Sequence, residues 1–321
     1  VRGVGHACRR CGSLTAAAET LAACRGATRA PVQSAAMPVH LPDTVEAAVG
    51  HLAQHPQASV LAGGTDLMVE VNEGYRRPDD AVVVVNRIPE LRSWRRDGSS
   101  VTIGAAVTYR EIEIGPLGGL IPALAEAART VGSPQIRNAG TIGGNLGTCS
   151  PAGDGLPVLA ALDATVELAS AGGRRTVPVG EFMLGPKRTA LLPGELIVSV
   201  TTPLVDGWQG YAKVGVRNAM VIAVASACVV LDRTAERAAV ALGSVGPTVL
   251  RCPEAEQLLS SSIDWATLQI DDAAVERVGA TVSAESRPIT DHRSSADYRR
   301  HAVGVLARRL VRRARTGEVA A

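Results

Sequence analysis

The sequence predicts a mixed α+β fold built in two blocks, residues 37–206 and 207–315. Short runs rich in β-branched residues alternate with segments of helical periodicity in both blocks. Two glycine-rich turns follow apolar stretches in the first block. The sequence PLVDGW at 203–208 has the proline and glycine content typical of a boundary between domains.

The first block is expected to begin with a helix and to continue with strands. Asp43 and Glu46 form a D-x-x-E capping pattern for a helix over 43–55, where apolar residues recur at helical spacing. Further elements follow from runs of β-branched residues and from helical periodicity. The expected strands cover 58–64, 81–87, 100–107, 164–170, 174–180 and 195–203, and the expected helices cover 108–114 and 121–130.

The second block combines strands with polar helices. Strands are expected at 209–217 and 238–245, with an apolar segment at 221–231 between them. The sequence SADYRRHAVGVLARRLVRRA at 295–314 places basic residues between apolar ones at helical spacing. It therefore predicts a long amphipathic helix at the end of this block.

Residues 1–36 differ from the rest of the chain. They contain five arginines and a single acid, Glu19, and they lack helical or strand periodicity, so we expect a disordered leader. No apolar core of a secretory signal follows the charges. Cys8 and Cys11 form one CxxC pair without a second pair, which leaves a zinc site incomplete. The solitary cysteines are expected to be small buried residues in a reducing cytosol.

The composition excludes several classes of partner. The formal net charge is only +2 and aromatic residues make up 2%, so neither an electrostatic footprint nor a stacking platform for nucleic acid is present. No apolar run approaches the roughly 20 residues that a membrane-spanning helix requires. We therefore expect a cytoplasmic protein that binds neither nucleic acid nor membrane.

Two glycine-rich stretches, VLAGGTDLMVE at 60–70 and RNAGTIGGNLGTCSPAGDGLPVLAAL at 137–162, carry the strongest functional signal. Glycine lets the main chain approach a ligand and adopt positive φ, and a turn that opens a helix gathers N–H groups at one spot. Two such turns in one block suggest a pyrophosphate, and hence a dinucleotide. The residues in these positions are Gly63, Gly64, Thr65 and Asp66 in the first stretch, and Thr141, Gly143, Gly144 and Asn145 in the second.

Other interpretations of these stretches have less support. Either stretch alone would more often be an ordinary turn. Neither matches G-x-G-x-x-G or G-x-x-x-x-G-K-[ST], so Rossmann and P-loop folds have no motif behind them. The sequence G-x-S-x-G is absent, and no histidine lies in either stretch, so we assign no catalytic acid, base or nucleophile and no metal ligand.

These motifs resemble the FAD-binding subunit of the molybdenum hydroxylases, the family of xanthine dehydrogenase, carbon monoxide dehydrogenase and related aza-arene oxidoreductases. The resemblance covers residues 37 to about 315 and also includes NRIPEL, YAKVGVRNAMVIAVA and YRRHAVGVLARR. Within the family the motifs are most similar to those of bacterial xanthine dehydrogenase. The implied fold is a two-lobed FAD-binding domain of the vanillyl-alcohol oxidase type, at 37–206, followed by a smaller α+β C-terminal domain at 207–315.

The resemblance also implies FAD as the cofactor and assigns its contacts. Residues 60–67 match the pyrophosphate loop, and the second glycine stretch lies near the pyrophosphate and the ribityl chain. Asp154 is expected near cofactor hydroxyls, because a carboxylate beside phosphate would be repelled. A cation at Lys213 would favour the anionic reduced flavin. The implied cofactor-binding residues are Val60, Leu61, Ala62, Gly63, Gly64, Thr65, Asp66, Leu67, Val131, Thr141, Gly143, Gly144, Asn145, Asp154, Ile197 and Lys213.

The implied function is electron transfer in a heteromeric enzyme of the xanthine dehydrogenase type, within purine metabolism. Substrate is oxidised in a molybdenum-cofactor-binding large subunit, electrons cross the [2Fe-2S] clusters of a small subunit, and they leave through FAD to NAD or another acceptor. The only cysteine between residues 37 and 206 is Cys149, so the cysteine-rich loop of benzoyl-CoA-reducing relatives is not expected.

Two alternatives remain open at this point. The chain could be a self-sufficient FAD-dependent oxidase or reductase with its own substrate pocket, or a non-catalytic nucleotide-binding assembly protein. The substrate, the physiological acceptor and the oligomeric state are not determined by the sequence.

Overall fold

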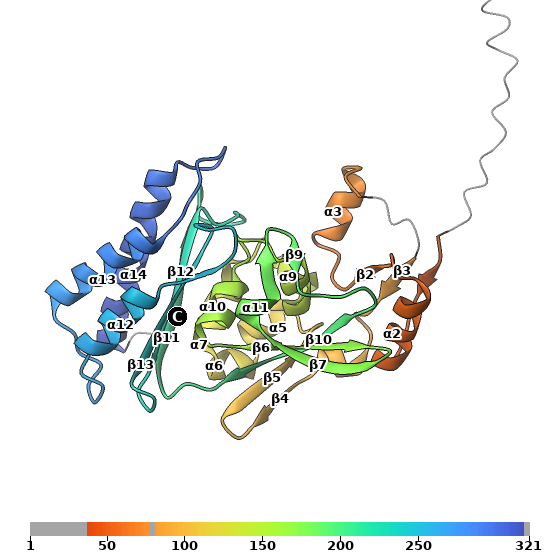
Figure 1. Cartoon of the computed structure of the whole chain (residues 1–321), viewed down its shortest axis with the longest axis horizontal. Helices are drawn as coiled ribbons and strands as arrows, with labels where there is room; N and C mark the ends of the chain where they lie inside the picture. The colour runs from red at the N-terminus through yellow and green to blue at the C-terminus, as the bar shows by residue number, and fades with distance from the viewer. Residues whose placement is uncertain (1–36, 77–80, 318–321) are drawn as a thin grey trace, which may run out of the picture. The chain divides into compact units, whose positions relative to one another are not determined.

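Three sheets and a short hairpin make up the β structure of residues 37–76 and 81–317, the part of the chain described by the computed structural model (Figure 1). Residues from Pro38 onward form one packed unit. It contains helices and strands, partly in separate runs such as α5–α10 and β10–β14, which agrees with the mixed α+β class expected from the sequence. The expectations for residues 1–36, including Cys8 and Cys11, lie outside the described residues.

A small parallel sheet opens the fold. Its order is β1-β3-β2, and helix α2 connects the first two strands in the chain. The helix begins after Thr44, whose hydroxyl accepts a hydrogen bond from the Ala47 N–H at 3.1 Å. The predicted cap at Asp43 is therefore wrong by one residue, because the Thr44 hydroxyl, and not the Asp43 carboxylate, accepts the hydrogen bond from the first turn. The elements are β1 (Val39–His40), α2 (Val45–Gln54), β2 (Ser59–Leu61), α3 (Leu67–Asn72) and β3 (Val82–Val84).

A five-stranded antiparallel sheet forms the second lobe, in the order β4-β5-β10-β6-β7. Strand β10 is central, and five of its eight residues are buried in succession because both of its faces are covered. Its register shifts between Ile197 and Ser199, next to the site described below. The strands are β4 (Trp94–Asp97), β5 (Ser100–Gly104), β6 (Thr165–Ser170), β7 (Gly173–Pro178) and β10 (Leu196–Pro203), with the hairpin β8 (Met183–Gly185) and β9 (Arg188–Thr189).

A layer of short helices fills the space between this sheet and the next one (Figure 1). Thr108 and Glu111 form a capping box that starts one of them. The helices of this layer are α5 (Tyr109–Ile114), α6 (Pro116–Leu120), α7 (Pro122–Thr130), α8 (Pro134–Ala139), α9 (Ile142–Thr148), α10 (Gly155–Ala161) and α11 (Val179–Phe182). Helix α4 (Pro89–Arg92) lies outside this layer, because its buried Leu91 shares a separate core cluster with Val45 of α2.

The third sheet is antiparallel, in the order β11-β12-β13-β14, and both of its faces are buried. Cys228 and Val230 pack into the core beneath α7 and α10, whereas Val229 and Leu231 pack against the C-terminal helices. The apolar segment predicted at 221–231 is thus largely a central strand. The elements are β11 (Gly207–Val214), β12 (Ala225–Asp232), β13 (Arg237–Gly243), β14 (Leu250–Arg251), α12 (Pro253–Ser262), α13 (Asp272–Glu285) and α14 (Ala296–Thr316).

A buried carboxylate joins the helical layer to the third sheet. Glu126 on α7 is 6% exposed; it accepts hydrogen bonds from the Tyr211 main-chain N–H at 2.7 Å and from Arg313 on α14 at 2.6 Å. The Arg313 guanidinium also lies 5.6 Å from the ring centre of Trp208. These contacts hold β11 against the helices that carry part of the site.

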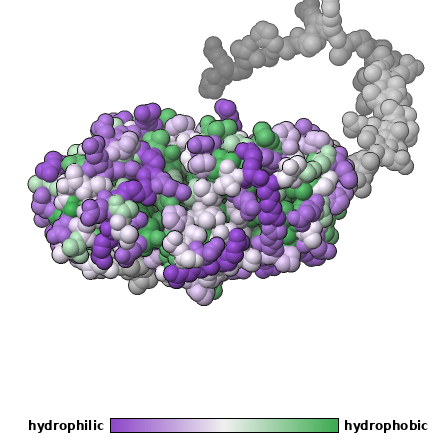
Figure 2. Space-filling model, turned by 60° about the horizontal axis from the view of Figure 1, so that its bottom comes forward, coloured by the Kyte–Doolittle hydropathy of each residue, from purple (hydrophilic) through white to green (hydrophobic). Residues whose placement is uncertain are grey.

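The described residues contain no helix that is both long and apolar enough to cross a membrane. On the face seen in Figure 2, polar and apolar side chains are interspersed.

Candidate cofactor-binding site

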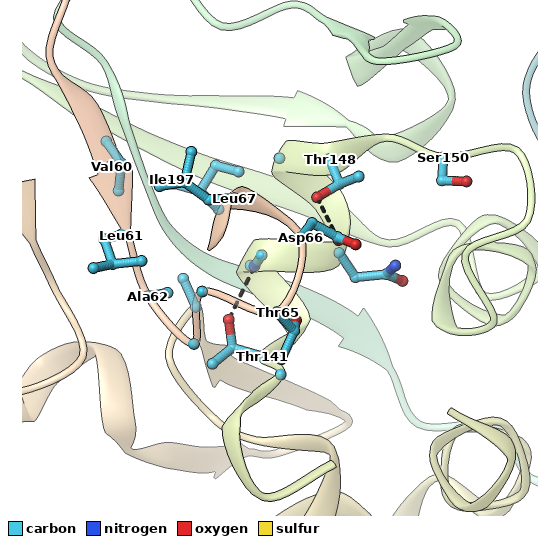
Figure 3. A pocket seen from close by; sticks show the side chains of 18 of the residues that line it. Val60, Leu61, Ala62, Thr65, Asp66, Leu67, Thr141, Thr148, Ser150 and Ile197 are labelled. Carbon is cyan, nitrogen blue, oxygen red and sulfur yellow. Dashed lines mark hydrogen bonds between the residues drawn. The ribbon is translucent and has the colours of Figure 1, made fainter. Parts of the chain in front are cut away.

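A cavity of about 750 Å³ lies where the parallel sheet, the helical layer and the five-stranded sheet meet. Its volume is in the range of sites that bind cofactors and other small molecules. Every predicted cofactor-binding residue except Lys213 lines it. Figure 3 shows Val60 and Leu61 on β2, the following loop with Thr65 and Asp66, and Thr141 and Thr148 around the same space. The structure therefore brings the two glycine stretches together.

The loop after β2 presents unused main-chain donors. Within the described residues, the N–H groups of residues 63–67 donate to no protein acceptor. Gly64 has φ +73°, a conformation that a residue with a Cβ adopts only at a cost. A Cβ on Gly63 would lie 1.8 Å from the Ala139 carbonyl oxygen, so the loop packs directly on the end of α8. Several convergent N–H groups in a fixed loop suit an anionic group such as a pyrophosphate.

The second glycine stretch uses its donors differently from the prediction. The N–H of Ile142 donates to the Val107 carbonyl at 3.1 Å, and that of Gly143 donates to the Ala105 carbonyl at 2.9 Å. The Gly144 N–H donates to the Thr141 hydroxyl at 3.0 Å. The prediction that free N–H groups at the start of α9 form a second phosphate site is therefore wrong, because acceptors within the protein already use these groups.

Gly143 and Gly144 have separate reasons to lack a side chain. A Cβ on Gly143 would lie 2.5 Å from the Cβ of Ala105, so this glycine allows α9 to pack closely on the end of β5. Gly144 lines the cavity, and a Cβ there would meet only the Thr141 hydroxyl at 3.0 Å. Neither residue has positive φ. Close packing, rather than an unusual backbone conformation, explains this pair.

A hydrogen bond connects the two stretches directly. The Thr148 hydroxyl donates to Asp66 Oδ2 at 2.9 Å, as the dashed line in Figure 3 shows. Asp66 and Thr148 are 82 positions apart in the sequence. The bond holds the loop of free N–H groups against α9, so both stretches form one wall of the cavity.

Asp154 lies in a buried polar cluster. It is 7% exposed, and its two oxygens accept hydrogen bonds from the Tyr211 hydroxyl at 2.8 Å and from the Lys213 ammonium at 2.7 Å. Burial raises the pKa of the Asp154 carboxyl above its ordinary value, and the Lys213 ammonium and the Tyr211 hydroxyl oppose that rise. The carboxylate therefore depends on Lys213 for its charge.

Lys213 lies behind Asp154 and is not among the residues that line the cavity. Besides Asp154, its ammonium donates to the Thr130 carbonyl at 2.8 Å and to the Val221 carbonyl at 3.1 Å. These acceptors account for its three donors. The structure thus gives no support to a direct cofactor contact by Lys213, and shows instead that it joins three segments of the cavity wall.

Tyr109 and Asn145 form a second polar pair in the lining. The Tyr109 hydroxyl donates to Asn145 Oδ1 at 2.7 Å. Burial, followed by the negative charges of Asp154 and Asp66, raises the pKa of Tyr109 well above its ordinary value, so the hydroxyl remains a donor. The bond fixes the amide of Asn145, which lines the cavity, and leaves its Nδ2 available as a donor.

Several lining residues were not identified from the sequence. Lys187 on the β8–β9 turn and Glu70 on α3 are charged, and the segment before β10 and the loop 220–222 add mainly apolar surface. The loop falls within YAKVGVRNAMVIAVA, a motif that carried the resemblance, so a signal for it was present. No pattern marks Lys187, which reaches the cavity only through the folding of a hairpin.

Known protein families match nearly all of the described chain. Residues 33–205 match the FAD binding domain in molybdopterin dehydrogenase, and residues 211–314 match the CO dehydrogenase flavoprotein C-terminal domain. Among individual proteins, the glyceraldehyde dehydrogenase medium chain of Sulfolobus acidocaldarius is 32% identical over 268 residues, which are 82% of this chain and 93% of that protein. The putative xanthine dehydrogenase FAD-binding subunit of Escherichia coli K12 is 30% identical over 284 residues, 85% of this chain and 94% of that protein.

Solved structures agree with these matches. A chain of carbon monoxide dehydrogenase from Hydrogenophaga pseudoflava, in a form that lacks the Mo-pyranopterin moiety of the molybdenum cofactor, superposes with a TM-score of 0.79. The two chains are 32% identical, and the match covers 87% of this chain and 96% of the other. The predicted α+β fold, with a two-lobed FAD-binding part and a smaller C-terminal part, is thereby confirmed.

Proposed function

Because this chain belongs to the FAD-binding subunits of the molybdenum hydroxylases, we propose that it is the electron-transfer subunit of a heteromeric enzyme of the xanthine dehydrogenase type. Its cofactor is FAD, and it is an oxidoreductase subunit. When bound, FAD supplies the redox chemistry, exchanging electrons between the iron–sulfur clusters of a partner and NAD or another acceptor. Residues 37–206 form the proposed FAD-binding domain, and 207–315 form the proposed C-terminal domain.

The loop of free N–H groups at 63–67 is the observation that supports the cofactor site most directly. The residues that carry these donors line a cavity of suitable size, and a pyrophosphate offers the acceptors that they lack. The residues present therefore fit FAD.

The other lining residues have complementary tasks in this proposal. Asn145 donates from its amide, and Asp154 retains lone pairs that can accept from sugar or ribityl hydroxyls. Val131 and Ile197 provide aliphatic surface that excludes water from the ring system. No side chain of this chain is required to move a proton of the oxidised substrate, because that reaction belongs to another subunit.

The proposed partners are a molybdenum-cofactor-binding large subunit and a [2Fe-2S] small subunit. The relatives are named as medium chains or FAD-binding subunits, and such names imply further chains in the same complex. We propose xanthine as the substrate class because of the motifs GGTDLMVE, SPQIRNAGTIGGNLGTCSPAGD and KVGVRNAMVIAV. Relatives named for glyceraldehyde and carbon monoxide are each 32% identical, and one named for nicotinate is 39% identical over 57% of this chain, so the substrate is the part that most needs a test.

One purification series tests this proposal. The chain alone should carry one FAD and should not oxidise xanthine, and the complex purified with its co-expressed neighbours should oxidise xanthine in preference to nicotinate, glyceraldehyde and carbon monoxide. Xanthine oxidation by the isolated chain would contradict the division of labour. A preference of the complex for one of the other three compounds would replace only the substrate.

A further inference from the structure

Helix α3 is an unusual part of the cavity wall. It follows directly on the loop of free N–H groups and contains four apolar residues in the sequence LMVEVN, yet none of its residues is buried. Met68 is 43% exposed and Val69 is 56% exposed. In Figure 1 the helix projects away from the three sheets. A short helix is normally stabilised by packing of its apolar face, and α3 lacks such packing.

Two direct polar contacts join α3 to other elements of the described chain. The first, between Asp66 and Thr148, fixes its N-terminal end. The second is an ion pair in its middle, between Glu70 Oε1 and the Lys187 ammonium at 2.5 Å, which joins residues 117 positions apart. Arg76 lies 3.8 Å from the other oxygen of Glu70 and also donates to the Ser59 hydroxyl on β2 at 3.2 Å, so it adds an indirect link from the helix to β2.

Lys187 is held in place for this contact. It lies on the turn between β8 and β9 and has φ +56°, which is uncommon for a residue other than glycine. Its main-chain N–H donates to the Cys149 carbonyl at 3.2 Å, which ties the turn to the end of α9. Glu70 and Lys187 both line the cavity. The ion pair therefore joins two separate parts of the cavity lining, α3 and the β8–β9 turn.

We propose that α3 is a flap over the FAD site, and that the Glu70–Lys187 ion pair is a latch that keeps it closed and sets the rate of FAD release. The inference rests on the proposed placement of FAD in this cavity. A bound pyrophosphate supplies acceptors to the loop that leads into the helix, and the flap must open for the cofactor to leave. Glu70 and Lys187 are accordingly positioning residues that act through α3.

The strength of the Glu70–Lys187 ion pair determines how much its loss should speed FAD release. The Lys187 side chain is 68% exposed and that of Glu70 is 24% exposed, so the ion pair is partly screened by water. Pairs of this kind correspond to about a two- to fivefold change in a rate or affinity. The latch should thus alter release measurably without deciding whether FAD binds at all.

FAD release from the purified, FAD-loaded chain tests the latch. An excess of an apo-flavoprotein captures released FAD and prevents rebinding, and the change in flavin fluorescence on transfer gives the rate. Lys187→Met and Glu70→Gln should each speed release about two- to fivefold. The double variant should release FAD no faster than the faster single variant, because one contact is lost in all three. Charge reversal in Glu70→Lys/Lys187→Glu should slow release relative to the neutral double variant, although repulsion from Arg76 prevents full recovery. The control is Arg312→Met, which removes an exposed ion pair to Glu276 at 2.6 Å between α13 and α14 and should leave release unchanged.

The outcomes separate three explanations. If Lys187 instead bound a phosphate directly, Glu70→Gln would free the lysine and slow release, which would overturn the latch. Release from both single variants at the rate of the Arg312→Met control would also overturn it. Absence of FAD from the unaltered chain would contradict the proposed function itself and would be seen before any variant is compared.

Discussion

Replacing Lys213 with methionine should strongly destabilise the protein, because the change leaves a buried carboxylate without its counter-ion. The side chains of Lys213 and Asp154 are each 8% exposed, so water cannot replace the lost ammonium. The Thr130 and Val221 carbonyls also lose a donor. Removing one partner of a buried ion pair typically costs about 3–5 kcal/mol, and we expect a loss of that size in the free energy of unfolding.

The double variant Asp154→Asn/Lys213→Met provides the matched control. It removes both charges, keeps an amide that can hydrogen-bond to Tyr211, and should recover at least about 2 kcal/mol relative to Lys213→Met alone. Denaturant unfolding of the apo-protein gives these values, and FAD titration of each variant reports the cavity separately. A cost below about 1 kcal/mol for Lys213→Met, or strictly additive effects in the double variant, would refute the role assigned to this ion pair.

Three further predictions concern glycines and an acid. Gly64→Ala should weaken FAD binding in an FAD titration. The control is Gly74→Ala, which has a similar φ of +76° and no atom within 4 Å of the new Cβ; it should add only backbone strain and leave FAD affinity unchanged. Gly143→Ala should lower stability by about 1–3 kcal/mol in denaturant unfolding, because its Cβ would lie 2.5 Å from that of Ala105. The main-chain N–H of Arg293 is the chief cause that lowers the pKa of Asp291 to about 2, although burial opposes the shift. The stabilising effect of the Asp291 carboxylate should therefore be complete above its ordinary pKa of 3.8 and disappear as the pH falls toward 2. Asp291→Asn should therefore be less stable than the unaltered chain near neutral pH, with a difference that shrinks across that acidic range.

The backbone conformation of the first glycine stretch could be predicted from the sequence because its signal is local. An apolar strand followed by Gly63 and Gly64 leaves few options for the backbone, and the structure shows positive φ and free N–H groups there. The capping residue of α2 was missed by one position, since Asp43 and Thr44 are both good caps and only the backbone geometry decides between them. Local chemistry thus predicts that a turn exists better than it predicts which atom forms each bond.

The second glycine stretch shows where local interpretation ends. The same Gly-Gly pair occurs in TIGGN, but the acceptors for its N–H groups come from Ala105 and Val107, more than thirty positions earlier in the chain. Nothing in the pentapeptide indicates that a strand end will pack against it. The role of Lys213 was obscured for the same reason, because Thr130, Asp154 and Val221 meet around it only in the folded chain.

The third sheet contributes to the cavity as well as to the core. Lys213 on β11 neutralises Asp154 in the wall, and Tyr211 on the same strand donates to the other oxygen of that carboxylate. Arg299, buried on α14, donates to the Val224 carbonyl at 2.8 Å and so fixes the end of the loop that carries residues 220–222 into the cavity. A site built only from residues 37–206 would leave Asp154 without either partner. The smaller C-terminal part therefore contributes to the proposed cofactor site, and motifs in both parts of the chain are needed to describe one cavity.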